Sequence, residues 1–149
     1  MSVFEDQTKK IDSKSNTLKS NDVLACVRPG LSDIGFNVEY PGNTIKIPVL
    51  HGERGKVKLA FKADALSEDN KTVIEVEAGR AYRNNQFLKD IFEASMMIET
   101  DYLVLAVREE YRGGSQLTED YKIISAFIEA MFSTNRISLK LKGILLIGY

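Results

Sequence analysis

Six apolar residues follow one another in Tyr102–Val107 (YLVLAV), between Asp101 and Arg108. An apolar run without alternation is typical of a strand that is covered on both faces. Helices with an apolar stripe are predicted before and after this run, at about 84–98 and 119–132. The chain is therefore expected to be an α/β protein with a central mixed β-sheet flanked by helices on both faces.

The strands predicted before this run alternate between apolar and polar residues. In Lys56–Ala65, the side chains of Lys58, Lys62 and Asp64 are expected on one face of the strand and apolar side chains on the other. The polar turn Ser67–Lys71 leads into a further strand. The remaining strands are predicted at 36–40, 44–49, 72–78 and 139–147. The strands at 36–40 and 44–49 are expected to form a hairpin, because Pro-Gly-Asn lies between them.

The N-terminal part is predicted to hold a flexible segment and one helix. Residues 1–15 are mostly polar and are expected to be flexible. Helical spacing begins near Leu18, and Pro29-Gly30 is expected to end or kink this helix. A chain of this length usually has one core, so residues 1–149 are expected to form a single domain.

Composition excludes several classes of protein. Cys26 is the only cysteine, which excludes an internal disulfide and any multi-cysteine zinc motif. The chain lacks a P-loop, a dinucleotide fingerprint and a paired metal-binding histidine motif. No signal-peptide pattern or apolar run of about 20 residues is present, so we expect a cytoplasmic protein without a membrane partner. The net charge of −1 does not indicate a nucleic-acid partner, since DNA-binding domains are commonly basic.

Three carboxylates on neighbouring predicted strands are the candidate metal ligands. Glu75 and Glu77 alternate on one strand, so they point to the same face about 6–7 Å apart. The flanking Ile74 and Val76 indicate an interior strand, where two like charges repel each other and lose solvation. A divalent cation would compensate for this, and Asp64 adds a third carboxylate from the preceding strand. Oxygen ligands of this kind suit Mg²⁺, with Mn²⁺ as a substitute.

Glutamates that alternate on a strand also occur on solvated faces, and this interpretation remains open. The residues that follow favour the metal site. Arg80 comes directly after the strand, and Arg83 and Gln86 lie where the next helix begins. Backbone N–H groups and arginines near carboxylates are a suitable setting for a phosphate.

The segment 62–81 (KADALSEDNKTVIEVEAGRA), followed by an amphipathic helix and YLVLAV, resembles the core of PD-(D/E)xK nucleases. The resemblance covers roughly residues 18–108 and implies a restriction endonuclease-like core. Such a core contains a helix, a strand meander, a helix and a further strand, with metal-binding acids on the second and third strands. Asp64 matches the aspartate of the family motif, and Glu75 matches its (D/E).

The chain departs from the family motif at two positions. Ala63 stands where the proline is found, as in many members. Glu77 stands where the lysine usually lies, and it is similar to the second glutamate of certain restriction enzymes in the family. Another cation must then take the place of the lysine. Lys62 and Arg80 are the candidates, and a solvated strand lysine is the interpretation of Lys62 that residue preferences favour.

The resemblance implies a Mg²⁺-dependent DNA endonuclease of restriction type, a hydrolase of phosphodiester bonds. Asp64, Glu75 and Glu77 would hold one or two metal ions. The negative charge that builds on the phosphate would be stabilised by Lys62 or Arg80. The residues expected to contact DNA are Lys58, Lys62, Arg80, Arg83 and Gln86.

Two further expectations concern partners. A twofold homodimer would suit a palindromic duplex site. The alternative function is that of a catalytically inactive nuclease-fold protein, acting as a DNA-binding or protein-assembly module. The missing lysine and the net charge of −1 favour this alternative, whereas the clustering of three acids argues against it.

Overall fold

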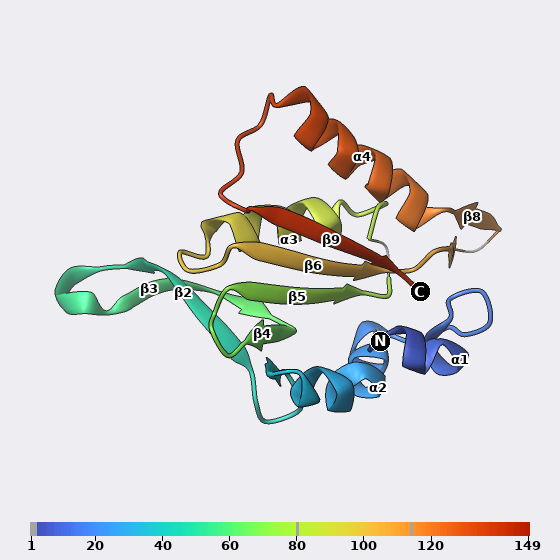
Figure 1. Ribbon diagram of the computed structural model, residues 1–149, viewed down its shortest axis with the longest axis horizontal. Coiled ribbons are helices and arrows are strands. Elements are labelled where there is room, and N and C mark those ends of the chain that lie inside the picture. The colour runs from blue at the N-terminus through green and yellow to red at the C-terminus, as the bar shows by residue number, and fades with distance from the viewer. Residues whose placement is uncertain (1–2, 80, 114) are drawn as a thin grey trace.

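The computed structural model describes residues 3–79, 81–113 and 115–149, and its central element is a five-stranded mixed sheet (Figure 1). The strand order is β1-β4-β5-β6-β9. The five strands are β1 (Phe36–Val38), β4 (Ala65–Ser67), β5 (Thr72–Glu77), β6 (Tyr102–Val107) and β9 (Gly143–Gly148). The apolar run forms β6, with β5 and β9 as parallel neighbours. β4 is antiparallel to both β1 and β5. The predicted α/β class with a central mixed sheet is confirmed.

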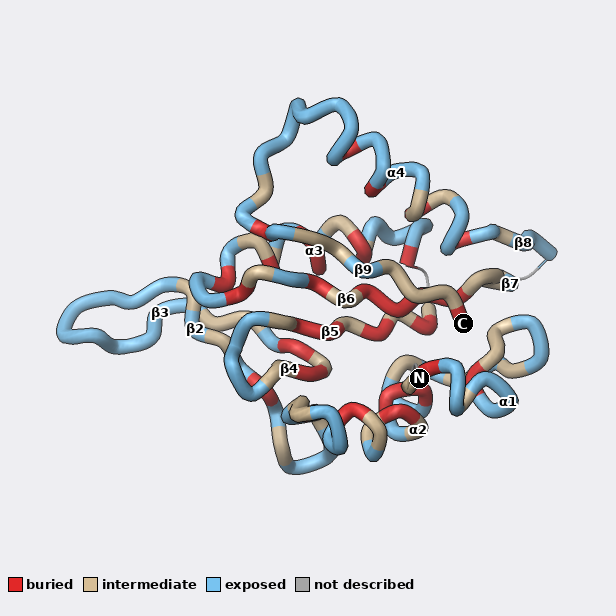
Figure 2. Tube along the Cα trace, in the orientation of Figure 1, coloured by how far each residue is buried: buried red, intermediate tan, exposed pale blue. Residues whose placement is uncertain are grey.

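The sheet separates two apolar clusters. The first contains Val23 and Val27 of α2 (Ser20–Asp33), which pack with Ile74 and Val76 of β5. On the other face, Val73 of β5 packs with α3 (Gln86–Met96) and α4 (Asp120–Thr134). Buried residues therefore follow the strands and the inner sides of the helices (Figure 2). Within the described ranges, no helix has the length and apolar character needed to cross a bilayer.

Two antiparallel strands, β2 (Ile45–His51) and β3 (Val57–Ala63), extend away from the sheet as a two-stranded arm (Figure 1). A short 3₁₀ turn, η2 (Glu53–Gly55), lies between them at the tip. The hairpin expected between 36–40 and 44–49 is therefore wrong. β1 pairs instead with β4, which buries Val38 at the edge of the sheet.

Three other features of the structure differ from the predictions. Pro29 lies inside α2, and the helix continues because Val27 and Leu31 on either side of it are buried against the sheet. The strand expected at 56–65 is divided at Asp64 into β3 and β4. The third difference is a pair of short antiparallel strands between β6 and α4 that the sequence analysis does not predict. These strands are β7 (Tyr111–Gly113) and β8 (Gln116–Thr118).

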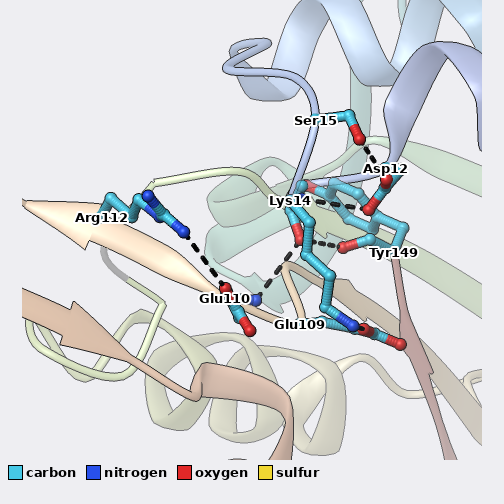
Figure 3. A network of polar contacts seen from close by, with 8 residues as sticks. Asp12, Lys14, Ser15, Glu109, Glu110, Arg112 and Tyr149 are labelled. Carbon is cyan, nitrogen blue, oxygen red and sulfur yellow. Dashed lines mark hydrogen bonds and ion pairs between the residues drawn. The ribbon is translucent and has the colours of Figure 1, made fainter.

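The N-terminal segment, expected to be flexible, packs against the sheet over much of its length. It contains η1 (Glu5–Gln7) and α1 (Thr8–Ile11), and the side chain of Ile11 is only 1% exposed. The following turn is tied to the end of β9, since the Ser13 hydroxyl donates to the Tyr149 carbonyl (Figure 3). Apolar burial of Phe4 and Ile11 explains how this segment packs into the cluster beneath α2 despite its polar composition.

We expect Ile11→Ala to lower the free energy of unfolding by about 2–4 kcal/mol, because it leaves a cavity in the cluster beneath α2. Lys10→Ala is the matched control, because Lys10 is exposed on the same short helix. It should change the free energy by less than about 0.5 kcal/mol. Urea unfolding monitored by circular dichroism measures both. Equal effects of the two substitutions would show that the segment is not part of the core.

Candidate functional site

Asp64 lies at the point where the chain leaves the arm and enters the central sheet. The pairing of β4 with β5 begins at Ala65, opposite Ile74. One step further, the backbone of Asp64 is no longer paired with β5, although its carbonyl accepts a hydrogen bond of 2.7 Å from the N–H of Glu39 on the other side. Its carboxylate Oδ2 instead accepts a hydrogen bond of 2.8 Å from the N–H of Val76. This bond holds the Asp64 carboxylate against β5, beside the two glutamates that flank Val76.

Glu75 and Glu77 occupy the face of β5 that α3 covers. They alternate with Ile74 and Val76, whose side chains belong to the cluster on the α2 side. Their neighbours on β6 are Leu105 and Val107, both fully buried. Each glutamate is therefore half-buried, with apolar side chains along one side and the charges of α3 above it.

A fourth carboxylate, Asp90 on α3, joins the three that the sequence predicts. It is only 3% exposed, and its Oδ2 atom is buried without a hydrogen-bond partner among the described residues. Sequence analysis missed it, although a signal was present. Asp90 lies three residues after Phe87 and directly before Ile91, on the apolar stripe of the helix. A charged residue on such a stripe is rarely buried unless it is paired or functional.

Burial raises the pKa of all four carboxyl groups, and the charges of neighbouring carboxylates add to the shift. Burial raises the pKa of Glu75 to about 10, and the charges of Asp64 and Asp90 add to this. The pKa of Glu77 is raised to about 7, first by burial and then by Asp90. Burial also raises the pKa of Asp64 to about 6, although the Val76 N–H opposes the shift. The pKa of Asp90 is raised to about 6 by burial, against the charge of Lys89.

Lys89 is the cation that the structure adds to this cluster. Its Nζ atom lies 3.6 Å from Oδ1 of Asp90 and 3.6 Å from Oε2 of Glu93. Its positive charge lowers the pKa of each of the four carboxyl groups. The sequence offered little sign of this role, since an exposed lysine on a helix is common.

The other predicted site residues are placed elsewhere. Lys58 and Lys62 are exposed on β3, and Gln86 is the first residue of α3. Arg83 donates hydrogen bonds to the Thr118 Oγ1 and Gln116 Oε1 atoms of β8, at 3.0 and 3.1 Å. Arg83 is thus held against the β7–β8 hairpin. Arg80 lies outside the described residues.

The donor atoms of the carboxylate cluster are of the kind that a divalent cation prefers. Their arrangement among the described residues does not form a complete ligand group. All the donors of the cluster are carboxylate oxygens, and Asp90 contributes a buried oxygen atom without a partner. In the part of the chain that is described, no group of three or more Asp, Glu, His or Cys residues is arranged to hold a metal ion. Mg²⁺ usually takes one or two carboxylates and retains several waters, so a set of three is not required.

The raised pKa of Glu75 predicts an unusual pH dependence of stability. The unfolded chain releases this proton near pH 4.5, whereas the folded chain retains it to about pH 10. The free energy of unfolding of the metal-free protein should therefore fall as pH rises from about 4.5 toward 10. Glu75→Gln should remove this loss and stabilise the metal-free protein at pH 8 by about 1 kcal/mol or more, with little effect at pH 5.

Urea unfolding at both pH values in the presence of a chelator tests this expectation. Glu129→Gln, on the exposed side of α4, is the matched control and should have little effect at either pH. Equal stabilisation at pH 5 and pH 8 would contradict the assignment of a buried, protonated Glu75.

Comparisons with protein-family models, curated protein sequences and solved structures gave no match to this chain. The function proposed for it therefore rests on the carboxylate cluster and on the sequence pattern that predicts it.

Proposed function

We propose that this chain is a metal-dependent DNA endonuclease with a restriction endonuclease-like core, which hydrolyses phosphodiester bonds. The observation that carries the proposal is the gathering of Asp64, Glu75 and Glu77 on adjacent strands, with Asp90 above them. Four acids that raise one another's pKa values destabilise the metal-free fold. A bound cation is the direct compensation for that destabilisation.

The order of the elements supports the same proposal. A helix, α2, is followed by β1, β4 and β5, which form an antiparallel meander in the sheet. The helix α3 then leads to β6, which is parallel to β5. This order supports the core that the family resemblance implies, if the arm is taken as an insertion between the first and second strands of the meander. Asp64 directly precedes the second strand, and Glu75 and Glu77 lie on the third.

Asp64 and Glu75 would be the principal metal ligands, with Glu77 as a third. Bound Mg²⁺ or Mn²⁺ would polarise the phosphate and lower the pKa of a coordinated water. The Val76 N–H orients Asp64 for this role, because it occupies Oδ2 and leaves Oδ1 for another partner. Metal binding at neutral pH must displace the proton from Glu75.

Lys89 would supply the positive charge that the family motif places at the position of Glu77. Its ammonium group is exposed, as that of Lys62 is, but it lies 3.6 Å from Asp90 Oδ1 and its charge lowers the pKa of all four carboxyls. A cation at that position would stabilise the negative charge that develops on the phosphate. DNA as the partner, a twofold homodimer and a cytoplasmic location belong to the same proposal.

A second candidate is a catalytically inactive nuclease-fold module that binds DNA or a protein partner. Two observations favour it: Glu77 in place of the usual lysine, and no three-residue ligand group among the described residues. The two candidates differ in whether the carboxylates are needed for turnover.

A plasmid-nicking assay with Mn²⁺ or Mg²⁺ separates the two candidates. The wild-type chain should nick supercoiled DNA, and a chelator should abolish the reaction. Glu75→Gln should lower the rate at least about 100-fold, because it removes a charged metal ligand while preserving the side-chain shape. Glu129→Gln should leave the rate unchanged. Equal rates for wild type and Glu75→Gln would refute the catalytic role. No nicking of any DNA substrate would favour the inactive module.

The position of the catalytic cation can be tested separately. Lys89→Gln should lower the nicking rate by about 100-fold, because it removes the positive charge nearest the carboxylates. Lys62→Gln should lower it less than about tenfold, since Lys62 forms no ion pair with a described carboxylate, whereas Lys89 is paired with Asp90. Lys89→Arg retains the charge and should recover part of the activity. If Lys62→Gln lowers the nicking rate more than Lys89→Gln does, Lys62 and not Lys89 is the catalytic cation.

A further inference from the structure

The β2–β3 arm has a charge opposite to that of the rest of the chain. Residues 45–63 contain five basic side chains and one acidic side chain, a net charge of +4, whereas the whole chain carries −1. The basic residues are Lys46, Arg54, Lys56, Lys58 and Lys62. All five are exposed, and Figure 2 shows that the outer part of the arm has almost no buried residue. The arm therefore carries a net positive charge on one projecting element, whereas acids outnumber bases in the rest of the chain.

The pairing within the arm places like charges together. Lys46 on β2 lies directly opposite Lys62 on β3. Directly opposed like charges destabilise an antiparallel pair. None of the five basic side chains of the arm forms an ion pair with a described residue. Nothing in the described structure offsets this repulsion, so a polyanion that binds along the arm would relieve it.

The packing at the base of the arm determines which face of the arm is exposed to solvent. Ile45 belongs to the apolar cluster beneath α3, and Ile47 and Phe61 pack against it. Side chains alternate along a strand, so Lys46 and Lys62 point away from this cluster toward solvent. The arm is thus amphipathic at its base, with a free basic face.

We propose that the β2–β3 arm is a binding element for double-stranded DNA, whose lysines contact the phosphate backbone. The identity of the polyanion rests on the proposed function. A two-stranded ribbon has the width that the major groove of DNA admits. Lys58 and Lys62 are separated by about 13 Å along β3, which corresponds to about four base pairs of duplex.

The arm also leads directly to the carboxylate cluster. Lys62 precedes Asp64 by two residues, so the basic face ends beside the first of the acids. The tip exposes Leu50, Val57 and Leu59, and an anionic lipid surface could also attract basic and apolar residues. The basic residues at the base, next to Asp64, favour DNA over a lipid surface.

Fluorescence anisotropy with a labelled duplex oligonucleotide in Ca²⁺ tests the arm, using full-length protein. The arm variant carries Lys46→Gln, Lys56→Gln and Lys58→Gln, and it retains Lys62. The control variant removes three exposed lysines elsewhere, with Lys9→Gln, Lys10→Gln and Lys140→Gln. The arm variant should bind duplex at least about tenfold more weakly. The slope of log affinity against log salt should fall by about 2–3, since each phosphate contact contributes about 0.9. The control variant should bind like wild type.

Two results would overturn the inference: equal weakening in both variants, or no weakening in the arm variant. A wild-type chain that binds phosphatidylserine vesicles but not duplex DNA would overturn it as well. The nicking assay keeps this inference distinct from the proposed function. If the protein nicks DNA and the arm variant binds duplex as tightly as wild type, the proposed role of the arm is refuted and the nuclease proposal stands. If duplex binding depends on the arm but no DNA is nicked, the proposed role of the arm is supported and the nuclease proposal is refuted.

Discussion

The hydrogen bond from the Val76 N–H to Asp64 Oδ2 is the interaction on which the candidate site depends. Asp64 interrupts the strand that would otherwise run from β3 into β4, and its carboxylate replaces a backbone carbonyl as the partner of β5. This substitution has two consequences. The arm can diverge from the sheet at this residue, and a carboxylate is held between two glutamates of a neighbouring strand. The same bond lowers the pKa of Asp64, which opposes the effect of burial.

Bringing four carboxyl groups together is unfavourable, and the packing of the apolar clusters on both faces of the sheet offsets this free energy. Ile74 and Val76 anchor β5 to α2, whereas Val73 anchors it to α3 and α4. Because both faces are covered, Glu75 is half-buried beside the charges of Asp64 and Asp90, and its pKa rises to about 10. An exposed sheet would have left the glutamates ionised and separated by solvent. Because the sheet is covered on both faces, the charges of the carboxylates must be offset by a bound cation or by protonation.

The sequence predicted those parts of the fold and site that depend on periodicity along a single element. The run Tyr102–Val107 predicted β6, and the alternation in β5 predicted that Glu75 and Glu77 share a face. Features that depend on contacts between distant elements were missed. Periodicity does not tell which strand β1 pairs with, and Asp90 enters the site only because α3 crosses above β5. Lys89 was missed for the same reason.

The net charge of −1 is the sum of two segregated charge distributions. The arm carries +4, which leaves the remainder of the chain at −5, and composition alone cannot reveal this separation. A polyanion would be repelled by the acidic cluster at long range but attracted to the arm. Screening limits both effects to about 10 Å at moderate ionic strength, so the local charge decides where such a ligand approaches. Approach along the arm would bring a phosphate to Asp64 from its basic side. A cation in the cluster would then remove the repulsion that remains, so metal binding and DNA binding should favour each other.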